Sequence, residues 1–173
     1  MGEELNLIMG GEAGQGLDTV AGLLGRAVVR SGRHMLTAQH VMSRVRGGHN
    51  NFRMRIGAAP VLGPPDTFRL LAAMSRESVD LHRAKLDEGA VVLVDAAWGL
   101  PAEPGLVGVP FADLAPRPVF RSVVLLGVLG AMLGIDRATL AELLSGHFRA
   151  KGDQIVSSNL GVLAASMDWA AQH

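Results

Sequence analysis

The densest group of chemically capable side chains is the stretch MSRVRGGHNNFRMRIG, residues 42–57, which holds four arginines. Arg44 and Arg46 are two residues apart, so in an extended chain their guanidinium groups point the same way and could hold a diphosphate. Two glycines would let the chain turn beneath them, while His49 and Asn50 add neutral polar groups. Two interpretations stay open at this point: a local site for a phosphate-bearing ligand, and a solvated hairpin with surface arginines, which is the commoner case in an arbitrary protein.

A second stretch, IMGGEAGQGLDT at residues 8–19, places four glycines between an expected strand and an expected helix. Glycines there bring backbone amides close to a bound phosphate, which the helix N-terminus also favours. The spacing G-G-x-x-G-x-G differs from the dinucleotide fingerprint, and no basic residue follows as in a Walker loop. Glu12 counts against a bare phosphate, and Gln15 is a candidate polar contact. A phosphate-type site and a purely structural turn both stay open.

The composition limits what the chain does elsewhere. It has 173 residues, 49% hydrophobic and 18% charged, with sixteen basic and sixteen acidic residues. The neutral balance argues against nucleic acid or an anionic membrane as the main partner. The absence of cysteine excludes disulfides, thiolate zinc sites and cysteine-ligated iron–sulfur clusters within this chain. The acidic start MGEEL does not resemble a signal peptide, and the most apolar run, residues 123–135, is shorter than the roughly 20 residues that span a bilayer. We therefore expect a cytoplasmic protein.

The hydrophobic pattern then places these stretches on secondary structure. An apolar run without alternation, as in residues 90–95, is typical of a strand covered on both faces, whereas residues 52–56 alternate as a half-buried strand does. The expected strands are 5–9, 34–39, 52–56, 67–74, 90–95 and 106–111, and the expected helices are 17–30, 75–87 with Gly89 as its stop, 119–133, 136–147 and 154–171. This order predicts an α/β fold: a three-layer Rossmann-like domain, 1–173, with C-terminal helices and a mostly parallel sheet that can include one antiparallel strand.

The other polar residues give little sign of catalysis. The spacing of His34, His40 and His49 matches no helical ligand pair, so we expect no metal site. No nucleophile and base stand in a recognisable arrangement, and we expect no catalytic residue in this chain. Asp95 ends a strand at the edge where α/β folds bind ligands, although fixing a loop or capping a helix is the preferred interpretation; Asp113 and Asp136 are expected to be helix caps.

The pairing of GGEAGQGLDTVAGLLGRAVVRSG with SRVRGGHNNFRMRIG about thirty residues later resembles the gamma domain of the 2-oxoacid:acceptor (ferredoxin) oxidoreductases, the pyruvate/ketoisovalerate oxidoreductase gamma family. It is closest to the form that begins the alpha subunit of 2-oxoglutarate-type enzymes. The resemblance continues weakly through LVDAAW and the C-terminal helices, and so covers most of the chain.

The resemblance implies a division of labour. Family members decarboxylate a 2-oxoacid on thiamine diphosphate, pass electrons through iron–sulfur clusters to ferredoxin and release an acyl-CoA. It implies that the thiamine and cluster sites belong to catalytic alpha and beta subunits, and that the gamma component is inactive alone and is associated with coenzyme A. In this sequence, the residues to which the resemblance assigns the association with coenzyme A are Gly14, Gly16, Ser43, Arg44, Arg46, Gly47, Gly48 and Asn50.

One family position departs from the pattern. An Arg/Asn pair is common before the first C-terminal helix, whereas this chain has Arg121 and Ser122. Arg53 and Arg55, which alternate away from the core, could extend the cationic cluster or pair with a partner subunit, and the partner is the preferred interpretation. Two other functions remain open: a stand-alone NAD(P)- or nucleotide-binding Rossmann protein, and a docking module without a catalytic role.

Overall fold

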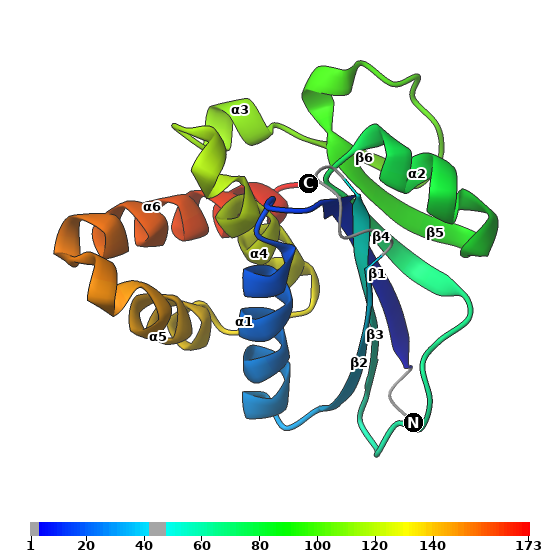
Figure 1. Cartoon of the computed structure of the whole chain (residues 1–173), viewed down its shortest axis with the longest axis horizontal. Coiled ribbons are helices and arrows are strands. Elements are labelled where there is room, and N and C mark those ends of the chain that lie inside the picture. The colour runs from blue at the N-terminus through cyan, green and yellow to red at the C-terminus, as the bar shows by residue number, and fades with distance from the viewer. Residues whose placement is uncertain (1–3, 42–47) are drawn as a thin grey trace. The chain divides into compact units, whose positions relative to one another are not determined.

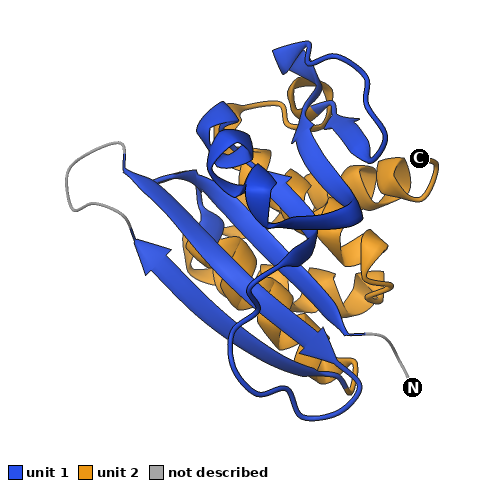
Figure 2. Ribbon diagram, turned by 90° about the vertical axis from the view of Figure 1, so that its right-hand side faces the viewer, with its two compact units in different colours: residues 1–17, 33–110 blue, residues 18–32, 111–173 orange. Residues whose placement is uncertain are grey.

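The computed structural model describes residues 4–41 and 48–173, and it divides into two compact units. Unit 1 comprises Met1–Leu17 and Arg33–Pro110, and unit 2 comprises Asp18–Gly32 and Phe111–His173 (Figure 2). Unit 1 carries the sheet and one α-helix, whereas unit 2 is helical in its described residues. The crossover after the first strand therefore leaves unit 1 and returns to it at the second strand.

A six-stranded sheet with the order β2-β3-β1-β4-β5-β6 forms unit 1 (Figure 1). The strand β3 is antiparallel to both neighbours, while the pairs β1–β4, β4–β5 and β5–β6 are parallel. The sheet is therefore mostly parallel with one reversed strand, as predicted. The strands are β1 Leu5–Glu12, β2 His34–Val41, β3 His49–Gly57, β4 Phe68–Ala73, β5 Leu86–Asp95 and β6 Leu106–Val109.

Burial in the strands follows the sequence pattern. On β3, Phe52, Met54 and Ile56 are buried, while Arg53 and Arg55 between them are half-buried. That alternation is expected where one face of a strand is packed and the other is more open. The end of β5 is buried without alternation from Val92 to Asp95, which fits a strand packed on both faces.

The helix α2, Arg76–His82, begins as predicted and ends earlier than predicted. Ser75 is its N-cap, and a 3₁₀ turn, Arg83–Lys85, follows it. The prediction of helix to about residue 87 is wrong, because β5 starts at Leu86, whose side chain packs against the core cluster of the sheet. Gly89 is not a helix stop: with φ 73° it lies inside β5, where the register with β4 shifts.

The end of the sheet differs in a similar way. The strand expected over 106–111 stops at Val109, and Phe111 is instead the buried first residue of the short helix α3, Phe111–Leu114. Asp113 lies within the first turn of α3 rather than before it, so the prediction of a cap at Asp113 is wrong.

Apart from Leu17, which belongs to unit 1, the longer helices lie in unit 2: α1 Leu17–Arg30, α4 Arg121–Met132, α5 Arg137–Phe148 and α6 Asp153–Ala170. Asp136 is the N-cap of α5, as predicted. The middle of α4 is buried, and Gly127 lies so close to α6 that an added Cβ would stand 2.7 Å from Cβ of Ser166. Ion pairs join Arg30 to Glu142 at 3.1 Å and Arg137 to Asp168.

The α/β class, the mostly parallel sheet and the C-terminal helices are thus confirmed. Among the described residues, no helix is both long and apolar enough to cross a membrane.

Candidate functional site

The glycine turn is shorter than the sequence suggested. Gly10 and Gly11 belong to β1 and pair with β3, so the expectation that they lie in the turn is wrong. The turn proper holds Gly14 and Gly16, with φ of 91° and 79°, values that side chains on an L-residue rarely allow. Gly14 is exposed, and a Cβ added to it would meet no atom within 4 Å. Glycine is therefore required at these two positions for backbone shape, and the outer surface of the turn is open.

Gln15 holds this turn in place. Its Oε1 accepts a hydrogen bond from the backbone N–H of Glu12 at 2.8 Å, and its Nε2 donates to the carbonyl of Met74 at 3.2 Å. Met74 in turn donates its N–H to the carbonyl of Gly10 at 2.8 Å. Both ends of the Gln15 amide are thus engaged with the chain, which makes it a support of the turn rather than the polar ligand contact that we expected.

The two motifs found in the sequence meet here. The backbone N–H of Ala13 donates to the carbonyl of Gly48 at 3.2 Å. Along the ladder between β1 and β3, Gly11 stands opposite Asn50. The Oδ1 atom of Asn50 is buried and has no hydrogen-bond partner. Of the predicted site residues, the structure therefore places Gly48, through its bond from Ala13, beside the turn that holds Gly14 and Gly16, and it places Asn50 opposite Gly11. Ser43, Arg44, Arg46 and Gly47 lie outside the described residues.

A buried histidine pair lies behind this junction. The Nε2 atoms of His49 on β3 and His82 on α2 are 2.8 Å apart, with the ring centroids 5.0 Å apart. The exposed fractions of the two residues are 2% and 4%. Sequence reasoning considered His49 as a neutral polar group beside the arginines or as a metal ligand, and missed His82, because nothing in a pair 33 positions apart signals contact.

Burial controls the protonation of this pair. Desolvation, aided by the neighbouring His49 and by Lys85, lowers the pKa of His82 to about 4. Burial also lowers the pKa of His49, against an opposing contribution from Glu77. Near pH 7 both rings are therefore neutral, and one Nε2–H donates to the other Nε2. Each Nδ1 is buried without a partner.

The absence of a side chain at Gly10 leaves room for His49 and Ser78 to lie above β1. A Cβ at Gly10 would lie 2.9 Å from Oγ of Ser78 and 3.0 Å from Cε1 of His49. Ser78 also shares a hydrogen bond of 2.9 Å with Oγ of Ser75, the N-cap of α2. The side chains of β3 and α2 thus meet over a strand position that has no side chain.

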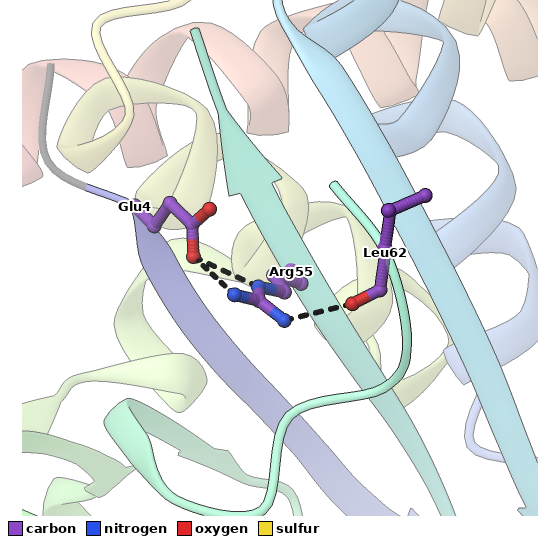
Figure 3. A network of polar contacts seen from close by, with 3 residues as sticks. All are labelled: Glu4, Arg55 and Leu62. Carbon is purple, nitrogen blue, oxygen red and sulfur yellow. Dashed lines mark hydrogen bonds and ion pairs between the residues drawn. The ribbon is translucent and has the colours of Figure 1, made fainter. Parts of the chain in front are cut away.

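The two arginines of β3 behave differently. Arg55 donates from Nε and Nη2 to Oε2 of Glu4, at 2.8 and 2.6 Å, and from Nη1 to the carbonyl of Leu62 at 2.9 Å (Figure 3). Its guanidinium is therefore occupied within the chain, and the expectation that Arg55 faces a partner is not supported by these contacts. Arg53, by contrast, has a buried Nε without a hydrogen-bond partner.

The remaining candidates have structural roles. Asp95 accepts a hydrogen bond from the N–H of Ala97 at 3.0 Å and fixes the turn after β5, as the preferred interpretation had it. The guanidinium of Arg121 lies 4.8 Å from the ring centroid of Phe111. Among the described residues there is no group of three or more His, Cys, Asp or Glu that could hold a metal ion.

A cavity of about 330 Å³ lies apart from these residues, between α2 and the start of β5, with Arg83 and Glu103 in its lining. These two side chains form an ion pair at 2.5 Å. None of the predicted site residues lines this cavity.

Known proteins with similar sequences are oxidoreductase subunits. The chain is 27% identical over 179 residues to ketoisovalerate oxidoreductase subunit VorA of Methanothermobacter marburgensis, a match that covers 98% of this chain and 37% of the relative. It is 30% identical over 78 residues to a 2-oxoacid:ferredoxin oxidoreductase subunit alpha of a Sulfolobus species, covering 45% of this chain and 12% of the relative. The chain thus spans well under half the length of these curated relatives.

Solved structures share the fold over nearly the whole chain. 2-Oxoglutarate:ferredoxin oxidoreductase from Magnetococcus marinus, solved with 2-oxoglutarate, coenzyme A and succinyl-CoA bound, matches with a TM-score of 0.90 at 23% identity, covering 99% of this chain and 32% of that one. The gamma subunit of a keto/oxoacid ferredoxin oxidoreductase from Geobacter sulfurreducens matches with a TM-score of 0.81 at 21% identity, covering 98% of each chain. At these identities the likeness establishes a common fold.

The family to which the chain belongs agrees with these relatives. The model of the pyruvate ferredoxin/flavodoxin oxidoreductase family matches residues 6–169, which include the glycine turn, β3 and the C-terminal helices. The chain therefore belongs to the pyruvate ferredoxin/flavodoxin oxidoreductase family.

Proposed function

We propose that this chain is the gamma component of a 2-oxoacid:ferredoxin oxidoreductase, a single gamma-type domain that contributes to coenzyme A handling and to subunit assembly. The overall reaction is the oxidative decarboxylation of a 2-oxoacid to an acyl-CoA. The catalytic alpha and beta subunits would hold the thiamine diphosphate and iron–sulfur clusters, and ferredoxin would be reduced by the complex in the cytoplasm. Membership of the family and the coenzyme A bound in the Magnetococcus marinus relative support this assignment.

The observation that carries the proposal is the hydrogen bond from Ala13 to Gly48. It holds the open glycine turn beside the residue that immediately follows Gly47, at the end of the sequence that contains Arg44 and Arg46. A turn with exposed backbone, joined to a segment whose preceding sequence carries two arginines, suits a ligand with several phosphates. The buried, unpartnered Oδ1 of Asn50 adds an acceptor for which a hydroxyl or amide of the ligand is a suitable donor.

The residues present therefore fit coenzyme A. Arg44 and Arg46 would hold its phosphates as charged, two-pronged donors, and Gly14 and Gly16 would let the ligand approach the backbone closely. Bound coenzyme A supplies the thiol that accepts the acyl group. Glu12 is exposed at the same turn, so the arginines must also offset its carboxylate.

Calorimetric titration of the purified complex with coenzyme A tests the site. We expect dissociation constants in the micromolar range, weakened by added salt, and weakened roughly tenfold or more by Arg44→Gln or Arg46→Gln because each removes charge-assisted hydrogen bonds. Arg26→Gln is the matched control: Arg26 is an exposed residue of α1 whose Nε bonds to its own helix. Unchanged affinity in both loop variants would overturn the assignment of the site.

Two further measurements separate the other functions. Tight binding of NADP⁺ by the lone chain, without binding of coenzyme A by the complex, would support a stand-alone nucleotide-binding protein. Co-expression with thiamine-binding subunits tests assembly: we expect a brown complex that reduces ferredoxin, while the lone chain stays colourless and inactive. An active lone chain would contradict the proposal. An active complex whose activity is unchanged by Arg44→Gln and Arg46→Gln would indicate a docking module.

A further inference from the structure

A cavity with apolar and cationic side chains lies within unit 2. Its volume is about 210 Å³, and its lining includes four apolar residues and two cations: Val119, Phe120, Phe148, Ile155, Arg117 and Lys151. They come from two places along the chain, around the 3₁₀ turn Pro118–Phe120 that precedes α4 and around the connection between α5 and α6 (Figure 1). We call this space the Phe120 cavity.

Proline and glycine fix the backbone on both sides of the Phe120 cavity. Arg117 stands between Pro116 and Pro118 and has an extended backbone, with φ −144° and ψ 151°, as a residue before proline prefers. Gly152 has φ 96°, which lets the chain turn between Lys151 and α6. The backbone therefore places the two cations beside the cavity before any other molecule binds.

The apolar lining ranges from buried to exposed. Phe120 is 5% exposed and Phe148 is half-buried, whereas Val119 is 71% exposed and Ile155 is 38% exposed. Single exposed apolar side chains are ordinary on a protein surface. Two that line the same cavity indicate a site where another apolar group is removed from water on binding.

The two cations lie over the aromatic rings of the cavity. The guanidinium carbon of Arg117 is 5.3 Å from the ring centroid of Phe120, and Nζ of Lys151 is 5.8 Å from the ring centroid of Phe148. In the described part of the chain neither cation has an ion pair. Contact with a ring keeps each charge near the cavity and leaves its N–H groups available to an acid.

The surroundings of the Phe120 cavity carry an excess of positive charge. The stretches that supply its lining, residues 117–120 and 148–159, contain Arg117, Arg149 and Lys151 against one acid, Asp153. Asp153 lies in the first turn of α6, where its carboxylate also compensates the helix dipole. The whole chain, by contrast, has as many acidic as basic residues. The local excess favours an occupant that is acidic.

Asn159 adds a hydrogen-bond acceptor to the cavity. It belongs to the lining and is 3% exposed, and its Nδ2 donates to the carbonyl of Ile155 at 2.7 Å. No described residue donates to its Oδ1, and this oxygen is not among the polar atoms that are fully closed off from solvent. A group that enters the cavity with an N–H or O–H therefore finds an acceptor there.

Size and charge together favour a protein segment as the occupant. Cavities that hold a whole small-molecule ligand measure roughly 300–1,000 Å³, so about 210 Å³ suits one large side chain. A tryptophan or tyrosine would fill such a space and donate to Oδ1 of Asn159. Its neighbours in the segment would cross the edge of the cavity, where carboxylates can reach both Arg117 and Lys151.

We propose that the Phe120 cavity docks an acidic segment of a catalytic subunit, which inserts one tryptophan or tyrosine side chain and places carboxylates against Arg117 and Lys151. This inference rests on the proposed function, because it requires the chain to assemble with such a subunit. It assigns the assembly role to the C-terminal helices rather than to Arg55, whose guanidinium is occupied by Glu4 and the carbonyl of Leu62 (Figure 3).

Competition during assembly tests the apolar part of the contact. The wild-type chain and a tagged variant are co-expressed with the catalytic subunits, and mass spectrometry measures their ratio in the purified complex. We expect Val119→Asp to be depleted about tenfold or more, because a carboxylate would stand where an apolar group and the acids of the partner must lie. Leu62→Asp is the matched control at an exposed position of unit 1, 83% exposed, and its ratio should stay within twofold of equal. Equal depletion of both variants would overturn the docking site.

Charge reversal tests the cationic part in the same assay. We expect Arg117→Glu and Lys151→Glu each to be depleted about fivefold, because each replaces an attraction by a repulsion. Arg26→Glu makes the same change on the exposed face of α1 and should stay within twofold of equal. Added salt should speed the dissociation of the wild-type complex more than that of the Arg117→Glu complex. Ratios near one in both cavity variants would contradict the proposed contact.

The lone chain separates docking from a structural role. Val119, Arg117 and Lys151 are exposed, so we expect the thermal midpoints of their variants to lie within about 2 °C of the wild-type value. Midpoints lower by about 5 °C or more in all three variants would show that these side chains support the fold, and the docking role would be wrong.

Photo-cross-linking identifies the occupant. A photoreactive amino acid is introduced in place of Val119, and the purified complex is irradiated and digested. We expect the captured peptide to come from a catalytic subunit and to contain a tryptophan or tyrosine with Asp or Glu within a few residues. Capture of a second copy of this chain, or of no peptide in an assembled complex, would overturn the proposal.

The remaining outcomes separate this inference from the proposed function. If the wild-type chain assembles and the Val119→Asp ratio stays near one, the docking site is wrong while the proposed function stands. If Arg117→Glu assembles normally and its complex loses coenzyme A affinity, the Phe120 cavity belongs to the coenzyme site and the docking role is again wrong. If the wild-type chain does not assemble with thiamine-binding subunits, the assembly part of the proposed function fails and the docking site fails with it.

Discussion

The Nε2 atoms of His49 and His82 lie 2.8 Å apart, and this contact links β3, the strand within the arginine-rich stretch 42–57, to the helix α2. One ring must donate and the other accept. The contact therefore depends on a pair in which at most one of the two rings is protonated to the charged form. Its burial leaves little water to stabilise a second charge.

The stability of the chain should fall in mild acid because of His82. Its folded pKa of about 4 lies below the ordinary 6.5, so the unfolded chain binds more protons between these values and stability declines as pH falls through that interval. The complete decline from this one group is about 3 kcal/mol, and His49 adds to it in the same direction. Urea denaturation at pH 7 and pH 4.5 measures the decline.

Replacing His82 isolates its share of that decline. We expect His82→Phe to lose some stability at pH 7, where the hydrogen bond to His49 is broken, and to show a drop between pH 7 and pH 4.5 that is smaller by about 2 kcal/mol or more. His34→Phe, at an exposed position, is the control and should keep the wild-type drop. An equal drop in His82→Phe would mean that the pair is not the acid-sensitive element.

Adding a methyl group at Gly10 should destabilise the chain. The new Cβ would press on Oγ of Ser78 and Cε1 of His49 at 2.9 and 3.0 Å, so we expect Gly10→Ala to lower the free energy of unfolding by roughly 1–3 kcal/mol. Gly22→Ala is the control: Gly22 is in α1, and its Cβ would meet no atom within 4 Å, so this substitution should stabilise the chain by roughly 0.5–1 kcal/mol. Chemical denaturation compares them, and equal effects would refute the role given to Gly10.

Removing the Gln15 side chain should loosen the glycine turn. Gln15→Ala loses the bonds to Glu12 and Met74, and we expect a cost of about 1–2 kcal/mol together with faster hydrogen exchange at the Glu12 amide. Gln15→Glu keeps the acceptor for Glu12 and loses only the donor to Met74, so in that variant the Glu12 amide should stay protected. NMR-detected exchange distinguishes the two, and protection in Gln15→Ala would contradict the role proposed for this side chain.

The N-cap of α5 should contribute measurably to the free energy of unfolding. Asp136 accepts from the N–H of Thr139 at 3.0 Å, so Asp136→Ala is expected to cost about 1 kcal/mol of stability. Asp113, which is exposed and lies within α3, provides the contrast: Asp113→Ala should change stability by less than about 0.5 kcal/mol. Thermal denaturation of both variants tests the difference, which would disappear if Asp136 did not cap the helix.

Local patterns in the sequence were enough to predict most elements. The alternation around Met54 and the cap at Asp136 were correct because they depend on neighbours within a few residues. The extent of α2 was not, since Leu86 pairs with Phe68 of β4, and that pairing outweighed the helical preference of the segment. A glycine can end a helix or relieve a strand at a shift of register, and only the neighbouring strand decides between them.

The candidate site was predicted in part. The sequence paired the glycine turn with the arginine-rich stretch, and the bond from Ala13 to Gly48 confirms that their described ends meet. The contact of His49 with His82 and the difference between Arg53 and Arg55 could not be predicted. Each depends on which side chain from a distant segment stands opposite, here His82 in one case and Glu4 in the other.

The ladder between β2 and β3 has a consequence for protein engineering. It runs from His34 opposite Gly57 to Val41 opposite Asn50, so both ends of the connecting sequence 42–47 are anchored by backbone hydrogen bonds. Doubling the length of a flexible connection costs only about 0.6 kcal/mol of closure entropy, and the anchors do not depend on its composition. Under the coenzyme A role proposed above, libraries that alter the length and charge of residues 42–47 would change which acyl carrier is recognised, while the paired residues of β2 and β3 keep their register.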